Sequence, residues 1–101
     1  ALALLHARVA HPWTTEALAQ EVGLSRSAFA ERFSALVGTP PMHYLANWRL
    51  QLAALRLRDS PASTAQIAYE VGYESEAAFC RAFKRHFDTT PAAWRRRQGA
   101  G

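Results

Sequence analysis

The sequence predicts an all-α fold of seven helices, arranged as two tandem helix-turn-helix subdomains joined by a long connecting helix. Three observations predict it: a repeated segment, paired helix-capping signals in each copy, and no segment with a convincing strand pattern. Hydrophobic residues make up 50% of the 101 residues and charged residues 20%, which is typical of a globular domain. This length is too short for a catalytic barrel or a doubly wound nucleotide-binding fold.

The repeat relates two segments of about fifty residues. The sequence LAQEVG at 18–23 recurs as IAYEVG at 67–72, an offset of 49. After one extra residue in the second copy the offset becomes 50, and the matching pairs are Ser25 and Ser75, Phe29 and Phe79, Phe33 and Phe83, Thr39 and Thr89, and Pro41 and Pro91. In both copies a small residue and a glycine stand four apart, as a tight turn between two steeply crossing helices requires.

The first copy begins with two expected helices. A short amphipathic helix covers Ala1 to Val9, and a second runs from about Thr15 to Val22. Thr14 can cap this second helix, and Trp13 before the cap is spaced to pack on Leu18. The glycine that follows the helix can adopt the left-handed conformation that ends it.

The next expected helix opens at Ser25, which is a favourable N-cap residue. Its apolar residues recur at helical spacing and predict one buried face, made of Phe29, Phe33, Leu36 and Val37.

A longer helix connects the two copies. It opens at Pro41 and runs to about Arg58, before a break at Ser60 and Pro61, and at 1.5 Å per residue it spans about 27 Å. We expect both copies to pack on its apolar residues, which are Leu45, Trp48, Leu50, Leu52, Ala53, Ala54, Leu55 and Leu57.

The second copy repeats the capping signals of the first. Ser63 and Gln66 form a capping box, and Ser75 opens a helix that carries three phenylalanines, Phe79, Phe83 and Phe87. A final helix is expected from Pro91 to Arg97. The predicted boundaries are about 1–40 for the first helix-turn-helix subdomain, about 41–58 for the connecting helix and about 62–97 for the second subdomain.

The charge balance favours a polyanionic partner, because twelve Lys and Arg against eight Asp and Glu give a net charge of +4 and a pI near 10.0. The single cysteine cannot form an internal disulfide. The apolar run from Ala1 to Leu5 is too short to span a membrane and is not a signal peptide, so we expect a cytoplasmic protein. Because the chain opens with Ala inside an expected helix, we interpret it as a fragment that lacks an N-terminal partner domain.

A spaced set of residues runs through the second copy: Ser63, Ile67, Ala68, Val71, Gly72, Tyr73, Glu74, Ser75, Phe79, Arg81, Phe83, Lys84, Thr90, Pro91, Trp94 and Arg95. This set closely resembles the C-terminal signature of the AraC/XylS family of bacterial transcription regulators. With the first copy and the connecting helix, the resemblance covers nearly the whole chain. It implies a seven-helix DNA-binding domain, which in full-length members usually follows an N-terminal ligand-sensing or dimerisation domain.

Two residues depart from the family pattern. Asp88 stands where the family often has Gly after the second recognition helix, although Asp tolerates left-handed geometry better than most residues. Glu31 stands where members often carry a basic or amide side chain, and a carboxylate that faces phosphates is repelled. This reduces the affinity expected from the first recognition helix.

The outward residues of the two recognition helices are the candidate DNA contacts, because such helices present their N-terminal half to base edges. With the phenylalanines inward, they are Arg26, Ser27, Ala30 and Glu31 in the first copy and Glu76, Ala77, Cys80 and Arg81 in the second. The resemblance implies groove contacts at the same positions. We expect Arg81 to contact guanine, which contributes about 1–3 kcal/mol of discrimination. Lys84 and Arg85, with Arg26, are better placed to contact phosphates.

Several of these residues have more than one interpretation. Glu31 and Glu76 can accept a hydrogen bond from cytosine, but acidic residues on a helix face are more often solvated or paired. Ala30 and Ala77 can contact a thymine methyl group or only allow close approach. The alternative to a guanine contact is that Arg81 is a surface arginine that is solvated or paired with a glutamate.

Other residues also allow two interpretations. Cys80 is either a small side chain that permits close approach to DNA or a redox-sensing thiol. Thr39, Thr89 and Thr90 lie near helix starts, where hydroxyl groups can bind phosphate. The run from Arg95 to Arg97 either attracts DNA or is a solvated tail.

Together these features predict a sequence-specific DNA-binding domain of a bacterial transcription regulator. Double-stranded DNA is the expected partner, RNA polymerase is a further candidate, and any small-molecule effector is expected to bind the missing domain. Because major-groove faces recur about every 34 Å, a connector of about 27 Å predicts either bent DNA or one partly inserted helix. The alternative is a helical protein-interaction module that contacts the transcription machinery.

An enzyme is not expected. The four histidines fall in different segments without metal-ligand spacing, and the sequence has no glycine-rich phosphate loop. We therefore predict no catalytic residues, no metal site and no cofactor.

Overall fold

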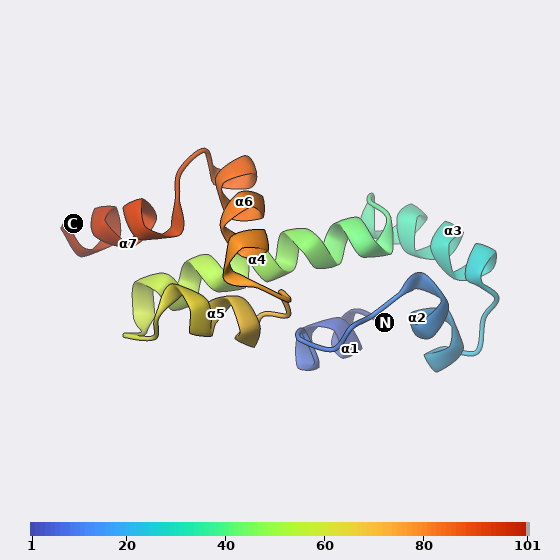
Figure 1. Cartoon of the computed structure of the whole chain (residues 1–101). Coiled ribbons are helices and arrows are strands. Elements are labelled where there is room, and N and C mark those ends of the chain that lie inside the picture. Colours follow the sequence, from blue (N-terminus) through green and yellow to red (C-terminus); the bar gives the residue numbers. More distant parts are fainter. Residues whose placement is uncertain (101) are drawn as a thin grey trace. The chain divides into compact units, whose positions relative to one another are not determined.

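The computed structural model describes residues 1–100, and these residues form seven α-helices and no strand (Figure 1). The helices are α1 (Leu2–Ala7), α2 (Thr15–Glu21), α3 (Arg26–Val37), α4 (Pro41–Asp59), α5 (Thr64–Glu70), α6 (Glu76–Phe87) and α7 (Pro91–Ala100). The predicted all-α fold with seven helices is confirmed for this part of the chain.

The chain divides into two compact units inside α4. The N-terminal unit covers Ala1–Trp48 and the C-terminal unit covers Arg49–Gly101. The connecting helix therefore contributes to both, because Leu45 is buried in the N-terminal unit while Leu50 and Leu57 are buried in the C-terminal unit.

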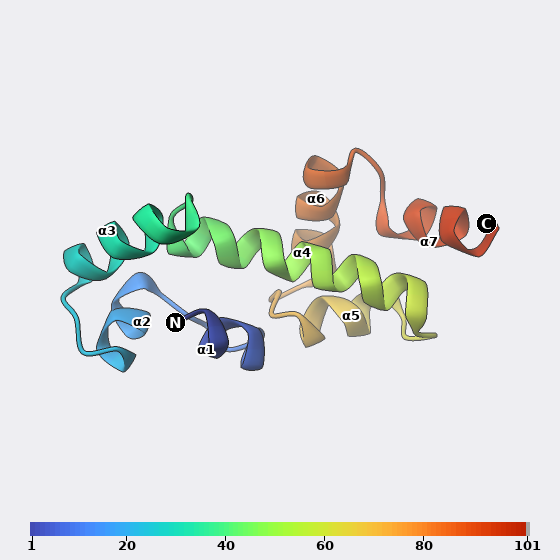
Figure 2. The ribbon, with the colours of Figure 1, turned by 180° about the vertical axis from the view of Figure 1, so that it is seen from behind.

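In the N-terminal unit, the predicted N-caps of α2 and α3 are confirmed. The Ala17 amide donates to Thr14 Oγ1 at 3.0 Å, and the Ala28 amide donates to Ser25 Oγ at 3.2 Å. The turn between the helices passes through Gly23, whose φ of 72° lies in the left-handed region. Figures 1 and 2 both show α2 beside α3.

Aromatic side chains hold α1 and α3 against the start of α4. A hydrogen bond of 2.7 Å joins His6 Nε2 to the Tyr44 hydroxyl, and the His6 ring lies 4.5 Å from the Trp48 ring. The Phe33 ring meets the Tyr44 ring edge-on at 5.7 Å. The core of this unit is therefore completed by residues from the first part of the connecting helix.

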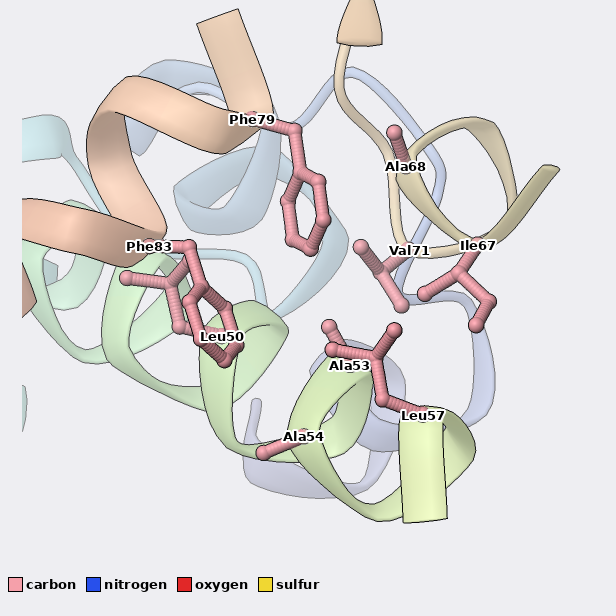
Figure 3. Packing of buried hydrophobic residues seen from close by; sticks show 9 residues of the cluster. All are labelled: Leu50, Ala53, Ala54, Leu57, Ile67, Ala68, Val71, Phe79 and Phe83. Carbon is pink, nitrogen blue, oxygen red and sulfur yellow. The ribbon is translucent and has the colours of Figure 1, made fainter. Parts of the chain in front are cut away.

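In the C-terminal unit, Ser63 and Ser75 cap α5 and α6 as predicted. Ser63 Oγ accepts from the Gln66 amide and Ser75 Oγ from the Ala78 amide, both at 3.1 Å. Figure 3 shows the buried cluster, in which the rings of Phe79 and Phe83 extend from α6 toward the side chains of the helices around it. Its members are Leu50, Ala53, Ala54, Leu57, Ile67, Ala68, Val71, Phe79 and Phe83.

The helix α7 is tied to the end of α4 by side-chain donors. The Trp94 indole donates to the Ala54 carbonyl oxygen at 3.2 Å. Arg95 donates through Nε to the Leu57 carbonyl oxygen at 2.9 Å and through Nη2 to that of Ser60 at 3.2 Å. Because the last carbonyl groups of a helix lack partners within it, Arg95 stabilises the C-terminus of α4.

Two predicted core residues lie in solvent instead. Leu36 is 87% exposed and Leu55 is 43% exposed. Helical spacing places Leu36 on the side of Phe29 and Phe33, but α2 is only 7 residues long beside the 12 of α3. Periodicity gives the side of a helix on which a residue lies, and a second element must still cover that side.

Candidate nucleic-acid interface

The outward face of α3 carries the candidates of the first copy. Arg26, Ser27 and Glu31 are exposed, and Ala30 is half-buried. Arg26 is the first residue of α3, and its Nε lies 3.0 Å from Glu16 Oε1 of α2. The expected outward orientation is therefore present, and one of these residues is already part of an ion pair.

The outward face of α6 carries the candidates of the second copy. Glu76, Ala77 and Arg81 are exposed, whereas Cys80 is half-buried. Burial raises the pKa of the Cys80 thiol, and the Glu76 carboxylate raises it further. The thiol therefore stays protonated at neutral pH, which disfavours a reactive redox sensor and agrees with a small side chain chosen for close approach.

The part of α6 from Arg81 to its end is strongly basic. Arg81, Lys84 and Arg85 line an open hollow together with Asp88, the residue that ends the helix. All four residues are exposed, and Lys84 and Arg85 also suit the negative end of the helix dipole because they lie in the last turn. The hollow brings together the residue expected to read guanine and the two expected to contact phosphates.

A tyrosine in the turn before α6 adds a hydroxyl group to this region. Burial raises the pKa of the Tyr73 hydroxyl, while the charges of Arg49 and Arg85 lower it. Burial also lowers the pKa of Arg49, and Tyr73 opposes that effect. Tyr73 belongs to the set that resembles the family signature, but its proximity to Arg49 could not be predicted, because residues so far apart in sequence give no local signal of it.

The expected threonine and arginine contacts are only partly available. Thr89 is 8% exposed, so its expected phosphate contact is disfavoured by burial. Thr90 is exposed but caps α7, since its Oγ1 accepts from the Ala93 amide at 3.2 Å. Thr39 is half-buried, and Arg95 binds the end of α4, which leaves Arg96 and Arg97 as the exposed part of the basic run.

Within residues 1–100, no group of three or more His, Cys, Asp or Glu side chains is arranged to hold a metal ion. None of the helices described above is long and apolar enough to cross a membrane.

Comparison with known proteins places this arrangement in context. A family profile described as "Helix-turn-helix domain" matches residues 18–97. The HTH-type transcriptional regulator AlkR of Acinetobacter baylyi is 46% identical over 95 residues, which cover 94% of this chain and 31% of AlkR. The chain thus spans about a third of the length of the curated relatives it matches.

Two solved structures share the fold over nearly the whole chain. A transcriptional regulator with an AraC-type DNA-binding domain from Chromobacterium violaceum is 30% identical, with a TM-score of 0.87 and coverage of 96% of this chain and 87% of that one. The DNA-binding domain of the global transcriptional factor AdpA, solved with a target DNA, is 29% identical, with a TM-score of 0.93 and coverage of 98% and 89%.

Proposed function

Because this chain belongs to the AraC-type family of helix-turn-helix DNA-binding domains, we propose that α3 and α6 are its recognition helices. They enter adjacent major-groove segments of one DNA duplex and read its sequence. The family is one of transcription regulators, and the likeness to a domain solved on its target DNA favours double-stranded DNA as the partner. The two alternatives expected from the length of the connector, a bent duplex or one partly inserted helix, belong to this proposal.

One observation carries the proposal: both helices leave their outward N-terminal halves exposed while their phenylalanines are buried. Ser27 and Arg81 lie in solvent, whereas Phe29 and Phe79 are at most 3% exposed. A helix that packs through one side and presents the other at the end of a tight turn has the form that fits a major groove.

The proposed roles divide along α6. Arg81 reads guanine through its two parallel donors, and Lys84 and Arg85 contact phosphates of the same groove. Glu76, Ala77 and Cys80 line the remaining part of the reading surface, as do Ser27, Ala30 and Glu31 on α3. Arg26 donates hydrogen bonds to the DNA from the start of α3.

The proposal also covers the rest of the protein. The chain has no catalytic residues or cofactor of its own and acts in the cytoplasm, where the DNA is. RNA polymerase is the proposed second partner, and any small-molecule effector binds an N-terminal domain outside this sequence. The proposed subdomain boundaries are about 1–40 and about 62–97, with the connecting helix at about 41–58.

Selection and salt titration test the DNA-binding role. The chain is used to select duplexes from a random-sequence library, and its affinity for the selected duplex is measured between about 50 and 200 mM salt. We expect enrichment of one sequence and a steep loss of affinity with salt, because bound cations are released from phosphates. No enrichment, or an affinity that salt leaves unchanged, contradicts the proposal.

A further inference from the structure

The ion pair between α2 and α3 gives a role to a residue outside the recognition helices. We propose that Glu16 is a positioning residue, which orients Arg26 so that its terminal amino groups read one base pair of the DNA site. This inference rests on the proposed function, because it requires α3 to lie in a major groove.

The geometry of the pair leaves Arg26 able to bind DNA. Glu16 Oε1 lies 3.0 Å from Nε of the guanidinium group, on the side of the side chain near the stem. Because the printed contact is to Nε, the pair itself does not use the two terminal amino groups, and two parallel donors of this kind match guanine O6 and N7. The side chains of Arg26 and Glu16 are 68% and 61% exposed, so the pair lies on the surface of the protein.

The stability of α3 does not explain why an arginine stands at this position. Arg26 is the first residue of the helix, where the partial positive charge of the helix dipole disfavours a cation. At the matching place in the second copy stands Glu76, whose negative charge suits a helix start. A residue that opposes its local environment and points outward is better explained by what it binds.

The partner of Arg26 is also confined to the first copy. The repeat aligns Glu16 with Ala65, so α5 offers no carboxylate at this place. The pair is therefore not required to hold two helices of this fold together, because α5 and α6 pack without it. Glu16 lies in the first turn of α2, however, and its removal also affects that helix through the dipole. The experiment must separate these two effects.

The experiment compares single-base preferences of four variants of the full chain. The variants are Glu16→Gln, Arg26→Ala, the double variant, and Glu21→Gln as the matched control. Glu21 is exposed at the other end of α2, and the ion pair of Arg26 is with Glu16, so the Glu21 substitution removes an equal charge and leaves that pair in place. Each variant is assayed on the duplex selected by the unsubstituted chain and on all of that duplex's single-base-pair substitutions.

We expect Glu16→Gln to weaken binding to the selected duplex by about two- to fivefold, which is the range of an exposed ion pair. The loss falls on one base pair, the same one whose preference Arg26→Ala abolishes. On the Arg26→Ala background the Glu16 substitution has no further effect. Glu21→Gln leaves every base preference unchanged.

Four results overturn the inference. If Glu16→Gln relaxes several base pairs, or weakens the Arg26→Ala chain further, Glu16 acts through the structure of α2. If Arg26→Ala lowers affinity without changing any base preference, Arg26 contacts phosphate only. If Glu16→Gln and Glu21→Gln both strengthen binding by the same amount, the Glu16 carboxylate only repels DNA. A chain that selects no sequence at all instead fails the proposed function, so the two failures are distinguishable.

Discussion

The two recognition helices share their packing and differ in the charges that they expose. Both have 12 residues, start at a serine cap and bury two phenylalanines. At two matching outward positions the charges are reversed, because Arg26 aligns with Glu76 and Glu31 aligns with Arg81. The repeat therefore preserves the residues that build the helix-turn-helix, and each copy carries its own surface for recognition.

The ends of the two helices differ as well. Lys84 and Arg85 of α6 align with Ser34 and Ala35 of α3, so α6 carries two cations where α3 carries none. Cations that contact phosphates supply affinity without sequence information. We therefore expect α6 to supply most of the electrostatic attraction and α3 to contribute mainly through the shape and donors of its first turn.

The largest expected effect tests whether the buried phenylalanines of α3 and α6 contribute equally to stability. Phe29→Ala and Phe79→Ala each remove a buried ring, and we expect each to lower the free energy of unfolding by about 3–5 kcal/mol. Urea unfolding followed by circular dichroism measures both, with Leu36→Ala as the exposed control at less than about 0.5 kcal/mol. If Phe29→Ala lowers the free energy of unfolding much less than Phe79→Ala does, the two helices do not contribute equally to stability.

Because Glu31 and Arg81 carry opposite charges at matching positions, we expect their substitution by alanine to change DNA affinity in opposite directions. Arg81→Ala is expected to weaken binding to the selected duplex by about 1–3 kcal/mol and to relax one base pair. Glu31→Ala is expected to strengthen binding to unrelated duplexes, because it removes a carboxylate that phosphates repel. Gel-shift titrations on both duplexes measure these changes. Equal losses on both duplexes make Arg81 a phosphate contact.

Two variants test the difference in phosphate contacts: one removes a cation from α6, and the other adds a cation at the matching position of α3. Lys84→Ala is expected to reduce the slope of log affinity against log salt by about one, with little change in sequence preference. Ser34→Lys is expected to increase the slope by about the same amount if α3 lies as close to phosphates as α6 does. An unchanged slope for Ser34→Lys shows that the end of α3 lies away from the DNA.

The sequence predicted the elements well because their signals are local. Thr14, Ser25, Ser63 and Ser75 each cap the helix that their spacing indicated. A cap depends on residues only three apart, and the repeat supplied the same signals twice. The turn glycines followed from the same local reasoning.

The errors and omissions concern contacts between distant residues. Leu36 and Leu55 have apolar side chains at helical spacing, but no neighbouring element covers them fully, which periodicity does not reveal. The hydrogen bond from Arg95 Nε to the Leu57 carbonyl oxygen joins residues that are 38 positions apart in the sequence. The Arg26–Glu16 pair crosses a turn whose angle the sequence does not specify. The exposure of the site residues could be anticipated, whereas their partners required the fold.

The smallest expected effect lies where the two helices end. Gly38 ends α3 with φ of 90°, whereas Asp88 ends α6 with φ of 59°, the one non-glycine residue of the described chain in the left-handed region. A Cβ at Gly38 would meet nothing within 4 Å, so Gly38→Ala costs only backbone strain, about 1 kcal/mol. Asp88→Gly removes such strain and is expected to stabilise the chain by about 0.5–1 kcal/mol.

Two effects contribute at Asp88, and a third variant separates them. The carboxylate also stands at the negative end of the α6 dipole, where it is unfavourable. Asp88→Asn removes the charge and keeps a side chain that tolerates the left-handed conformation. Thermal unfolding should rank the melting temperatures as Gly above Asn above Asp, over a range of about 2–8 °C. If Asn equals Gly, charge explains the whole difference between the two helix ends, and if Asn equals Asp, backbone strain explains it.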